Sequence, residues 1–376
     1  MNLFRCFYLK NRVYLCINIK IKPLILLVSL NHKNTTLVER EPFYFDDIEK
    51  EKFYLFIRSK LNLKGIFLLS TCNRSDFYFH FDKKSNLIID FVIKLIESFK
   101  KNNFNRQKIT IKTDLRDITT NIFRTACGIE SMVIGEYEIV DQIKKSLNHS
   151  IQKKYISPLL NRLIQKSLEC SKYVRTNTMI NKGSTSVSSV LINNLSNFYN
   201  LNNKSVMIVG AGKMSKLSIR HLKSKTTKKI YVTNRSSEQL EKLYNLFDIT
   251  KVSFKNYIQY IPKMDFVIFL TSSKKPLITD KDLALLSTQL SKKIMFIDLS
   301  VPRNINIERF YENITEFNLD NLKSEIESTK KYRSDEIEKA EKFIQIFQKK
   351  FDDWFKKYNH IRQNKKSENK ILSIHK

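Results

Sequence analysis

Two groups of residues in this 376-residue chain have the types and the setting needed for a two-step reduction. Cys72 stands in a polar run directly after an apolar stretch, and the glycine-rich turn Gly210-Ala211-Gly212 follows a second apolar stretch. A cysteine thiolate can take an acyl group as a thioester, and a nicotinamide cofactor can reduce that thioester to an aldehyde. A single cysteine is more often a small buried hydrophobe, and isolated glycine-rich turns are common. The conjunction of the two predicts an acyl-reducing oxidoreductase.

The glycine-rich turn has the surroundings that a dinucleotide-binding fingerprint requires. Residues 205–209 predict a strand before the turn, and residues 214–222 predict a helix after it. Gly210 allows the tight turn and Gly212 lets a pyrophosphate approach the backbone. Ser215 stands at the third glycine position, so the fingerprint is imperfect.

The end of the next expected strand indicates which nicotinamide cofactor is used. An acidic residue there would bind the ribose 2′-hydroxyl, but Arg235 with hydroxyls beside it suits a 2′-phosphate. NADPH is therefore favoured over NADH; the alternative is that Arg235 lies on a solvated loop. The predicted cofactor-binding residues are Gly210, Ala211, Gly212, Lys213, Met214, Ser215, Asn234, Arg235 and Ser236.

Cys72 is the cysteine whose position favours chemistry. It follows an expected strand, where a loop exposes a nucleophile, and Arg74 is expected to lower its pKa or to bind a substrate carboxylate. Cys127 falls in a helical pattern and is interpreted as packing. Because the cysteines show no paired spacing, we expect a reducing, cytoplasmic location and no structural zinc, and the histidines show no metal-ligand spacing. His32 is either a pocket residue near Cys72 or a cap.

Composition narrows the class of protein further. The chain is 42% hydrophobic, which supports two or three domains. Its net charge of +30 suits a polyanion such as RNA, although abundant lysine, asparagine and isoleucine also indicate drift toward AT-rich codons. No apolar run approaches the ~20 residues needed to cross a bilayer, so no membrane partner is expected. Residues 1–23 are interpreted as an extension rather than a targeting segment, because no small-residue cleavage site follows them.

Hydrophobic periodicity predicts an α/β fold in which two domains precede a long helix. The first would be a small α/β domain with strands and helices at residues 24–32, 46–62, 65–70, 76–81 and 86–101, followed by helices over 118–181. Residues 203–310 alternate strands and helices as in a Rossmann-type doubly wound parallel sheet.

The last part of the chain predicts one long charged helix from residue 320 to about 358, followed by a frayed end. Its apolar stripe must pack on the other domains or on a second subunit. The stripe comprises Ile326, Ile337, Ala340, Phe343, Ile344, Phe347 and Trp354. The expected boundaries are 1–23 for the extension, 24–178 for a catalytic domain, 179–312 for a cofactor domain and 313–376 for a helical segment.

Several ordered sequence blocks resemble the glutamyl-tRNA reductase family, the NADPH enzymes that open tetrapyrrole synthesis from glutamate. The similarity runs from about residue 26 to about residue 345. The blocks are residues 30–33 with Glu39-Arg40-Glu41, 69–74, 128–136 with Gln142, 172–176, 184–188 and 298–303. Together they are far more specific than either of the first two signals.

This resemblance implies residue roles and partners. Cys72 would be the nucleophile, and Gly210 to Ser215 would hold NADPH. The glutamyl pocket would be lined by Thr71, Asn73, Arg74, Ser131, Glu136, Tyr137, Glu138 and Gln142. The implied partners are glutamyl-tRNA(Glu), a second copy in a homodimer, and a glutamate-1-semialdehyde aminotransferase that collects the product.

Three departures from the family pattern bear on these implied roles. Asn121 stands where the family usually carries a histidine, and asparagine cannot exchange a proton near neutral pH. Glu138 replaces a glutamine, and this extra carboxylate is unfavourable unless it pairs with the glutamyl ammonium. The C-terminal segment is shorter than the family's dimerisation region. The alternatives are a dehydrogenase resembling shikimate dehydrogenase, which leaves the Cys72 loop without a purpose, and a non-catalytic tRNA-binding relic.

Overall fold

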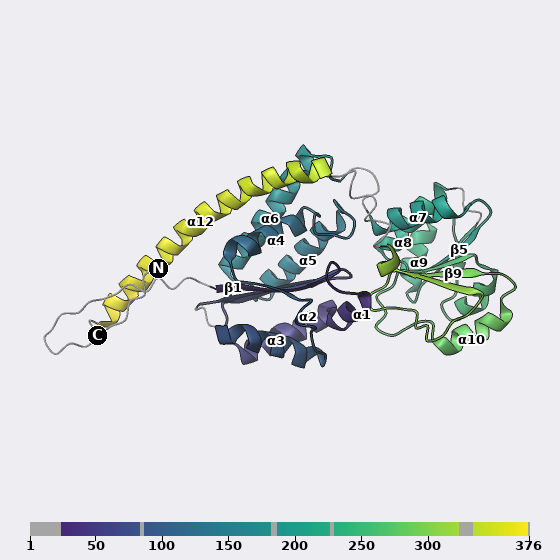
Figure 1. The fold of residues 1–376 in the computed structure, drawn as a ribbon, viewed down its shortest axis with the longest axis horizontal. Coiled ribbons are helices and arrows are strands. Elements are labelled where there is room, and N and C mark those ends of the chain that lie inside the picture. The colour runs from purple at the N-terminus through teal and green to yellow at the C-terminus, as the bar shows by residue number, and fades with distance from the viewer. Residues whose placement is uncertain (1–23, 83–85, 182–185, 226–228, 323–333, 375–376) are drawn as a thin grey trace.

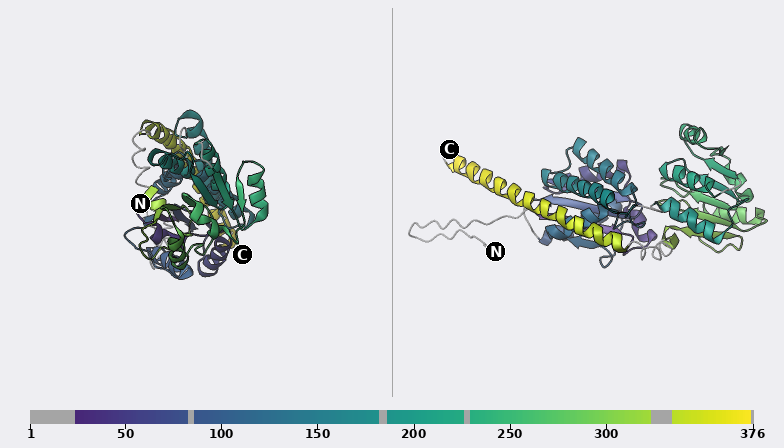
Figure 2. Two further views of the ribbon diagram at one scale, coloured as in Figure 1. Left: turned by 90° about the vertical axis from the view of Figure 1, so that its right-hand side faces the viewer. Right: turned by 90° about the horizontal axis from the view of Figure 1, so that it is seen from above.

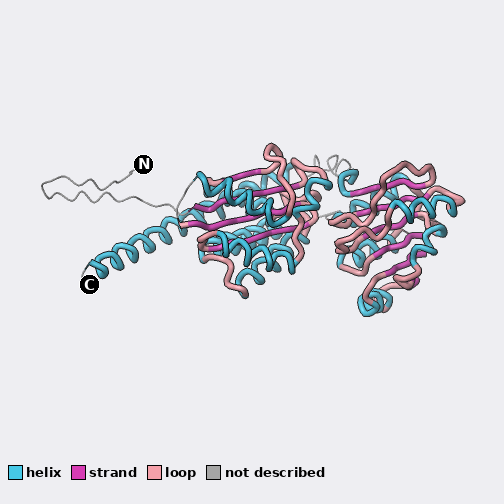
Figure 3. The backbone as a smooth tube through the Cα atoms, turned by 90° about the horizontal axis from the view of Figure 1, so that it is seen from below, coloured by secondary structure: helices cyan, strands magenta, loops and turns pink. Residues whose placement is uncertain are grey.

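The computed structural model describes residues 24–82, 86–181, 186–225, 229–322 and 334–374. Two α/β domains follow one another along the long axis, and a long C-terminal helix lies against the first domain (Figure 1). In the tube view the strands of the two domains form separate sheets (Figure 3). Cys6 and Cys16 and the expected extension at residues 1–23 lie outside the described residues.

The first domain contains a four-stranded antiparallel sheet in the order β2-β3-β1-β4. Its strands are β1 (Leu24–Asn31), β2 (Gly65–Thr71), β3 (Arg74–Phe81) and β4 (Thr110–Lys112). Because β1 and β2 flank β3 and both run antiparallel to it, their carboxyl ends meet at the same edge of the sheet. Asn31 and Thr71 both pair with Arg74 there. The three longer strands confirm the sequence prediction.

Helices cover both faces of this sheet, because alternate strand residues are apolar on both sides. One face packs on α4 (Leu115–Ala126), α5 (Glu138–Gln152) and α6 (Pro158–Asn177). The other packs on α2 (Asp47–Lys60) and α3 (Asn86–Lys100). Asp46, Asp114 and Ser157 cap the amino ends of α2, α4 and α6 through their side chains.

A short segment between β1 and α2 leads toward the second domain. It consists of α1 (Leu37–Arg40) and the 3-10 helix η1 (Glu41–Phe43). A capping box formed by Thr36 and Glu39 starts α1.

The second domain is a six-stranded parallel sheet in the order β10-β9-β8-β5-β6-β7, which is the doubly wound Rossmann arrangement. Its strands are β5 (Ser205–Val209), β6 (Lys229–Thr233), β7 (Thr250–Val252), β8 (Phe266–Phe269), β9 (Ile294–Asp298) and β10 (Ile314–Asn318). Its helices are α7 (Val187–Phe198), α8 (Lys213–Lys223), α9 (Ser237–Tyr244), η2 (Tyr257–Lys263) and α10 (Asp280–Gln289). The expected doubly wound fold is confirmed.

Two boundary predictions need correction. Since β10 pairs with β9 along its full length, the second domain extends beyond the expected boundary at residue 312 to at least Asn318. The C-terminal helix α12 (Ser334–Ile374) does not end near residue 358, because neither glycine nor proline interrupts it there. The three-residue strands β4 and β7 were not predicted, since so short a run carries no readable period.

The apolar stripe of α12 packs on the first domain of the same chain. Its residues join the core between the sheet and α4 and α6; they are Ile337, Ala340, Phe343, Ile344, Phe347, Phe351, Trp354, Phe355 and Tyr358. From above, α12 runs along the first domain and projects beyond it, away from the second domain (Figure 2). Of the two expected packing partners, the structure places this stripe on its own chain. Ile326 lies outside the described residues.

Candidate functional site

Cys72 occupies a two-residue hairpin turn between β2 and β3. The turn is held from both sides: the Asn73 amide donates to the Thr71 hydroxyl at 3.1 Å, and the His32 amide donates to the Asn73 carbonyl at 2.9 Å. The hairpin thus presents the Cys72 thiol at the carboxyl edge of the first sheet, where the sequence predicted it.

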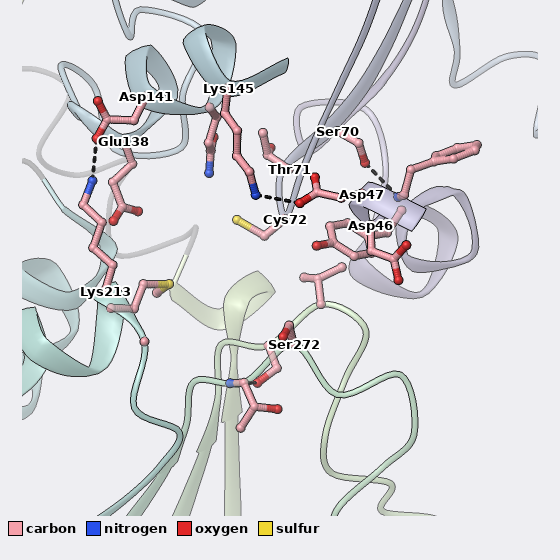
Figure 4. A pocket seen from close by; sticks show the side chains of 18 of the residues that line it. Asp46, Asp47, Ser70, Thr71, Cys72, Glu138, Asp141, Lys145, Lys213 and Ser272 are labelled. Atoms are coloured by element: carbon pink, nitrogen blue, oxygen red, sulfur yellow. Dashed lines mark hydrogen bonds and ion pairs between the residues drawn. The ribbon is translucent and has the colours of Figure 1, made fainter. Parts of the chain in front are cut away.

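The thiol faces a cavity of about 580 Å³ that is built by both domains. The first domain contributes Cys72 with Thr71, the segment from Tyr44 to Asp47, and one face of α5. The second domain contributes Gly212 to Met214 and the ends of β8 and β9. Figure 4 shows Cys72 and Glu138 directed toward the same space, with Lys213 at its edge reaching toward Asp141. The predicted nucleophile and the predicted cofactor turn therefore line one cavity.

Helix α5 contributes five polar residues to the lining of this cavity, namely Glu138, Asp141, Gln142, Lys145 and Ser146. They stand at spacings of three or four residues and so share one face of the helix. Glu138 and Gln142 were predicted from the sequence, whereas Asp141, Lys145 and Ser146 were not, although each lies three or four residues from a predicted position.

Most carboxylates around the cavity are already neutralised by lysines. Asp47 accepts from Lys145 at 2.6 Å, Asp141 accepts from Lys213 at 2.7 Å, and Asp46 pairs with Lys274. Among the described residues Glu138 has no hydrogen-bonded partner. Burial raises the pKa of Glu138, and the positive charge of Lys213 opposes that rise only in part. Glu138 is thus the cavity carboxylate available to a cation from outside.

The electrostatic surroundings of Cys72 favour the thiol over the thiolate. Burial raises the pKa of Cys72 to about 12, and the carboxylates of Glu136 and Glu138 add to the rise. The predicted lowering of the pKa by Arg74 is therefore wrong. The cation that opposes the rise is Arg40, a buried residue of α1.

Arg74 is held below the cavity rather than in its lining. Its guanidinium donates to Asp76 at 3.0 Å and to Thr125 at 2.8 Å, and it also binds the Glu130 carbonyl. The side chain is 4% exposed. The expected contact between Arg74 and a substrate carboxylate is thus not preformed, because the arginine ties the hairpin to α4.

The other predicted pocket residues divide between the lining and the layer beneath it. Thr71, Glu138 and Gln142 line the cavity, whereas Asn73, Ser131 and Glu136 are buried outside its lining. The buried Asn73 side-chain oxygen has no hydrogen-bond partner among the described residues. Burial raises the pKa of Glu136 to about 7, with Glu138 adding to the effect. Tyr137 is 53% exposed, and the Arg175 guanidinium lies over its ring.

The loop that carries Glu136 depends on glycine. Gly135 has φ of +80°, and a Cβ atom there would lie 1.8 Å from the Ile180 carbonyl oxygen. The Gly135 amide donates to the Gly128 carbonyl at 3.0 Å, which closes the loop between α4 and α5. No larger residue fits this close approach.

The Gly210 turn has the shape that a dinucleotide requires. Gly210 has φ of +119°, and a Cβ atom there would collide with the Leu270 carbonyl oxygen at 2.5 Å. Nothing lies within 4 Å of the corresponding position at Gly212, so the backbone is open to an approaching pyrophosphate. The turn follows β5 at the carboxyl end of the sheet, beside the end of the neighbouring strand β8. The order of strands in the sheet reverses direction between β5 and β8, and ligands usually bind at such a point.

A second cavity of about 390 Å³ continues from this turn. It is lined by Gly210 to Gly212, Asn234, Arg235 and Ser236 from the predicted set, and by Gln239, Phe254 and Leu277 in addition. The Arg235 guanidinium lies 5.7 Å from the Phe254 ring centroid and has no carboxylate partner among the described residues. Ser215 is fully buried and outside both linings. These residues fit the adenosine end of a dinucleotide.

The remaining candidates lie outside the cavity lining. Asn121 lies on α4, and its side-chain oxygen accepts a hydrogen bond from the Tyr78 hydroxyl at 3.0 Å. His32 is buried beside the hairpin, and its backbone amide holds the hairpin by donating to the Asn73 carbonyl. No group of three metal-ligating side chains is found in the described part of the chain. None of its helices is long and apolar enough to cross a membrane.

The fold and the site together define a class: a nucleotide-binding oxidoreductase fold joined to a cysteine-bearing α/β domain. Residues 28–178 match the sequence model of the glutamyl-tRNA reductase N-terminal domain, and residues 193–325 match that of shikimate/quinate 5-dehydrogenase. The chain is 30% identical to a glutamyl-tRNA reductase of Thermodesulfovibrio yellowstonii, covering 88% of this chain and 79% of the relative. It is 33% identical to one of Trichodesmium erythraeum, covering 88% and 78%. The chain belongs to the glutamyl-tRNA reductase family.

A solved structure shares the fold. The glutamyl-tRNA reductase from Methanopyrus kandleri aligns with a TM-score of 0.50 at 24% identity, covering 90% of this chain and 82% of that one. Both domains and the long helix are thus common to the two proteins.

Proposed function

We propose that this protein reduces the glutamyl group of glutamyl-tRNA(Glu) to glutamate 1-semialdehyde with NADPH, through a thioester on Cys72. The single observation that carries the proposal is the cavity shared by Cys72 and the Gly212–Met214 turn. It brings a nucleophile and a cofactor turn together, as a two-step acyl reduction requires. A shikimate dehydrogenase activity would leave Cys72 unused.

In the first step the Cys72 sulfur forms a bond to the ester carbonyl carbon. The carbon–oxygen bond to the tRNA breaks, and the ribose hydroxyl leaves with a proton. Because an aminoacyl ester is already activated, the barrier lies mainly in forming the thiolate. The raised pKa of Cys72 makes this the step that the surrounding charges control.

We propose that Glu138 binds the α-ammonium of the glutamyl group. It is partly buried, lines the cavity with Cys72 and forms no ion pair within the part of the chain that the structure describes, so a cation would relieve its desolvation. Pairing would also neutralise a carboxylate that raises the pKa of Cys72. The substrate itself would thus promote thiolate formation.

When bound at the Gly210 turn, NADPH would supply a hydride to the thioester carbon. The carbon–sulfur bond would then break, giving the aldehyde, and the Cys72 thiolate would take up a proton from solvent. The Gly210 turn and the amino end of α8 would hold the pyrophosphate, and Arg235 with Ser236 would bind the 2′-phosphate. Asn73 and Arg74, which lie outside the cavity lining, would hold the hairpin that carries Cys72 in place from beneath. The net charge of +30 favours tRNA as the carrier. A homodimer and a partner aminotransferase remain proposals from family resemblance.

The test is incubation with charged glutamyl-tRNA and NADPH, followed by an assay for the semialdehyde. Cys72→Ser should abolish reduction and leave NADPH binding intact, because a serine hydroxyl is not a nucleophile at neutral pH without a base. Semialdehyde formation by this variant at the wild-type rate would exclude the covalent mechanism. Tight tRNA binding by the wild type without any product would instead indicate the non-catalytic alternative.

A further inference from the structure

Two sequence blocks that the proposed chemistry leaves unused meet at the interface between the domains. Glu41 begins η1 in the first domain, and Arg303 follows β9 in the second. Arg303 donates from Nε at 3.0 Å and from Nη2 at 2.9 Å to the two oxygens of Glu41, and its amide donates at 3.3 Å. Such a two-pronged contact fixes orientation as well as distance.

A second contact lies one helical turn before the first. Asp320, directly after β10, accepts from the Leu37 amide at 2.8 Å and lies 3.6 Å from the Arg40 guanidinium. The Leu37 side chain is 2% exposed and belongs to the core cluster of the second domain. The α1–η1 segment is thus bound to the second domain by two ion pairs, by hydrogen bonds from the Leu37 and Arg303 amides, and by an apolar side chain.

Both sides of this contact lead directly into the cavity. The chain continues from Glu41 to Tyr44 and Asp46, which line the cavity. On the other side Ser300 and Val301 line it, two to three residues before Arg303. Asp298 holds that turn rigid by accepting from the amides of Ser300, Asn304 and Ile305 at 2.6–3.0 Å.

The Glu41–Arg303 pair is more sheltered than two other ion pairs that bridge the domains at the cavity, Asp141–Lys213 and Asp46–Lys274. The side chains of Glu41 and Arg303 are 18% and 33% exposed, compared with 50% and 57% for Asp141 and Lys213. Sheltered, bidentate pairs are screened less by salt and hold geometry better than exposed ones.

We propose that the clamp formed by Glu41–Arg303 and Leu37–Asp320 is a positioning device that sets the cofactor domain over Cys72 for hydride transfer. It rests on the function proposed above. The clamp touches no reacting group, so transfer of the glutamyl group to Cys72, which needs only the first domain and the substrate, should proceed without it. Hydride transfer should be slowed when the clamp is broken, because its rate depends on the distance between groups carried by different domains.

The test reverses the charges of the pair one at a time and then together. Glu41→Arg and Arg303→Glu are each compared with the double variant, and Lys223→Glu is the matched control, since Lys223 pairs with Asp248 at 2.9 Å within the second domain. Transfer of labelled glutamate to Cys72 is measured without cofactor, and reduction of the preformed thioester is measured in a single turnover at saturating NADPH. Hydrogen–deuterium exchange over residues 37–46 and 299–305 reports the contact independently of catalysis.

We expect each single reversal to slow reduction roughly tenfold or more, since misplacement by about 1 Å can cost 10²-fold. In the single variants thioester formation should stay near the wild-type rate, and hydrogen–deuterium exchange should rise in both segments. In the double variant both the rate of reduction and the exchange should return toward their wild-type values. The control should match the wild type. Single variants that reduce at the wild-type rate, or that lose both steps equally, would overturn the clamp. A wild-type protein that forms no thioester would overturn the proposed function. In that case the exchange measurement still tests the clamp, and hydrogen–deuterium exchange that the charge reversals leave unchanged would overturn it.

Discussion

At the residue scale, the cavity holds a nucleophile whose surroundings oppose its activation. Two carboxylates and burial keep the Cys72 thiol protonated, and Arg40 opposes them only in part. A thiol in this state is protected from adventitious oxidation and alkylation, because the thiolate is the reactive form. The site therefore suits a nucleophile that becomes reactive when a substrate places a positively charged group, such as an ammonium, beside Glu138.

Glu138→Gln should make Cys72 more reactive in the absence of substrate. Removing the negative charge lowers the pKa of the thiol, and each unit of lowering gives tenfold more thiolate at any pH well below that pKa. The measurement is the rate of alkylation by iodoacetamide between pH 7 and 9, which should rise with pH in both proteins and be faster in the variant. Asp141→Asn, whose carboxylate is already paired with Lys213, is the control and should change the rate little. Equal rates for Glu138→Gln and wild type would remove Glu138 from the control of the thiol.

Arg235→Ala should weaken binding of NADPH much more than binding of NADH. Loss of a charged hydrogen bond to the 2′-phosphate costs roughly 1.5–3 kcal/mol. Both affinities can be measured by fluorescence titration, with Lys242→Ala on the neighbouring helix α9 as the control. A similar loss for the two cofactors would mean that Arg235 does not contact the phosphate.

At the element scale, one face of a helix acts as a unit, because residues three or four apart lie on the same side. One face of α5 lines the cavity, and the apolar stripe of α12 completes the core beside α4 and α6. Arg124 on α4 joins Glu341 of α12 to Glu130 below the hairpin, so the long helix also reaches the supports of the site. Helix α12 is therefore part of the first domain rather than an appendage.

Phe351→Ala should destabilise the first domain by about 3–5 kcal/mol, as expected for a fully buried phenylalanine. The Phe351 ring stacks with Phe355 and lies beside Trp354, so its loss leaves a void. Urea denaturation gives the free energy of unfolding, and Ile346→Ala, whose side chain is 49% exposed, is the matched control. If the two variants lose the same small amount, α12 does not contribute to this core.

At the scale of the whole molecule, the carboxyl edges of two sheets face each other. The hairpin at the end of β2 and the turns after β5, β8 and β9 enclose one cavity, and the α1–η1 segment joins the domains beside it. Buried carboxyl groups at this junction make the free energy of unfolding depend on pH. Glu136 and Asp298 both have raised pKa values, about 7 and about 6.

Glu136→Gln should change how stability varies with pH. Because the folded protein holds the Glu136 proton up to about pH 7 and the unfolded chain releases it near 4.5, wild-type stability should fall as pH rises between these values. The slope from one such group approaches roughly 1.4 kcal/mol per pH unit. Urea denaturation at pH 5 and pH 8 should show a smaller loss in the variant. The lowered pKa values of Glu39 and Glu130, about 2, act only at more acidic pH. Parallel pH profiles for the two proteins would contradict the burial of an ionisable Glu136.

The sequence by itself determined the parts of the molecule that depend on neighbours along the chain. Strand and helix periods predicted β1, β5, β6 and most helices, and the motifs around Cys72 and Gly210 located both halves of the site, because turns and periodic faces are local properties. Only the tertiary structure decided which charges act on Cys72. Arg74, two residues away, is committed to Asp76, whereas Arg40 and Glu138, which come from distant segments, set the environment of the thiol. Charge interactions follow distance in space, and the packing of the two domains sets that distance.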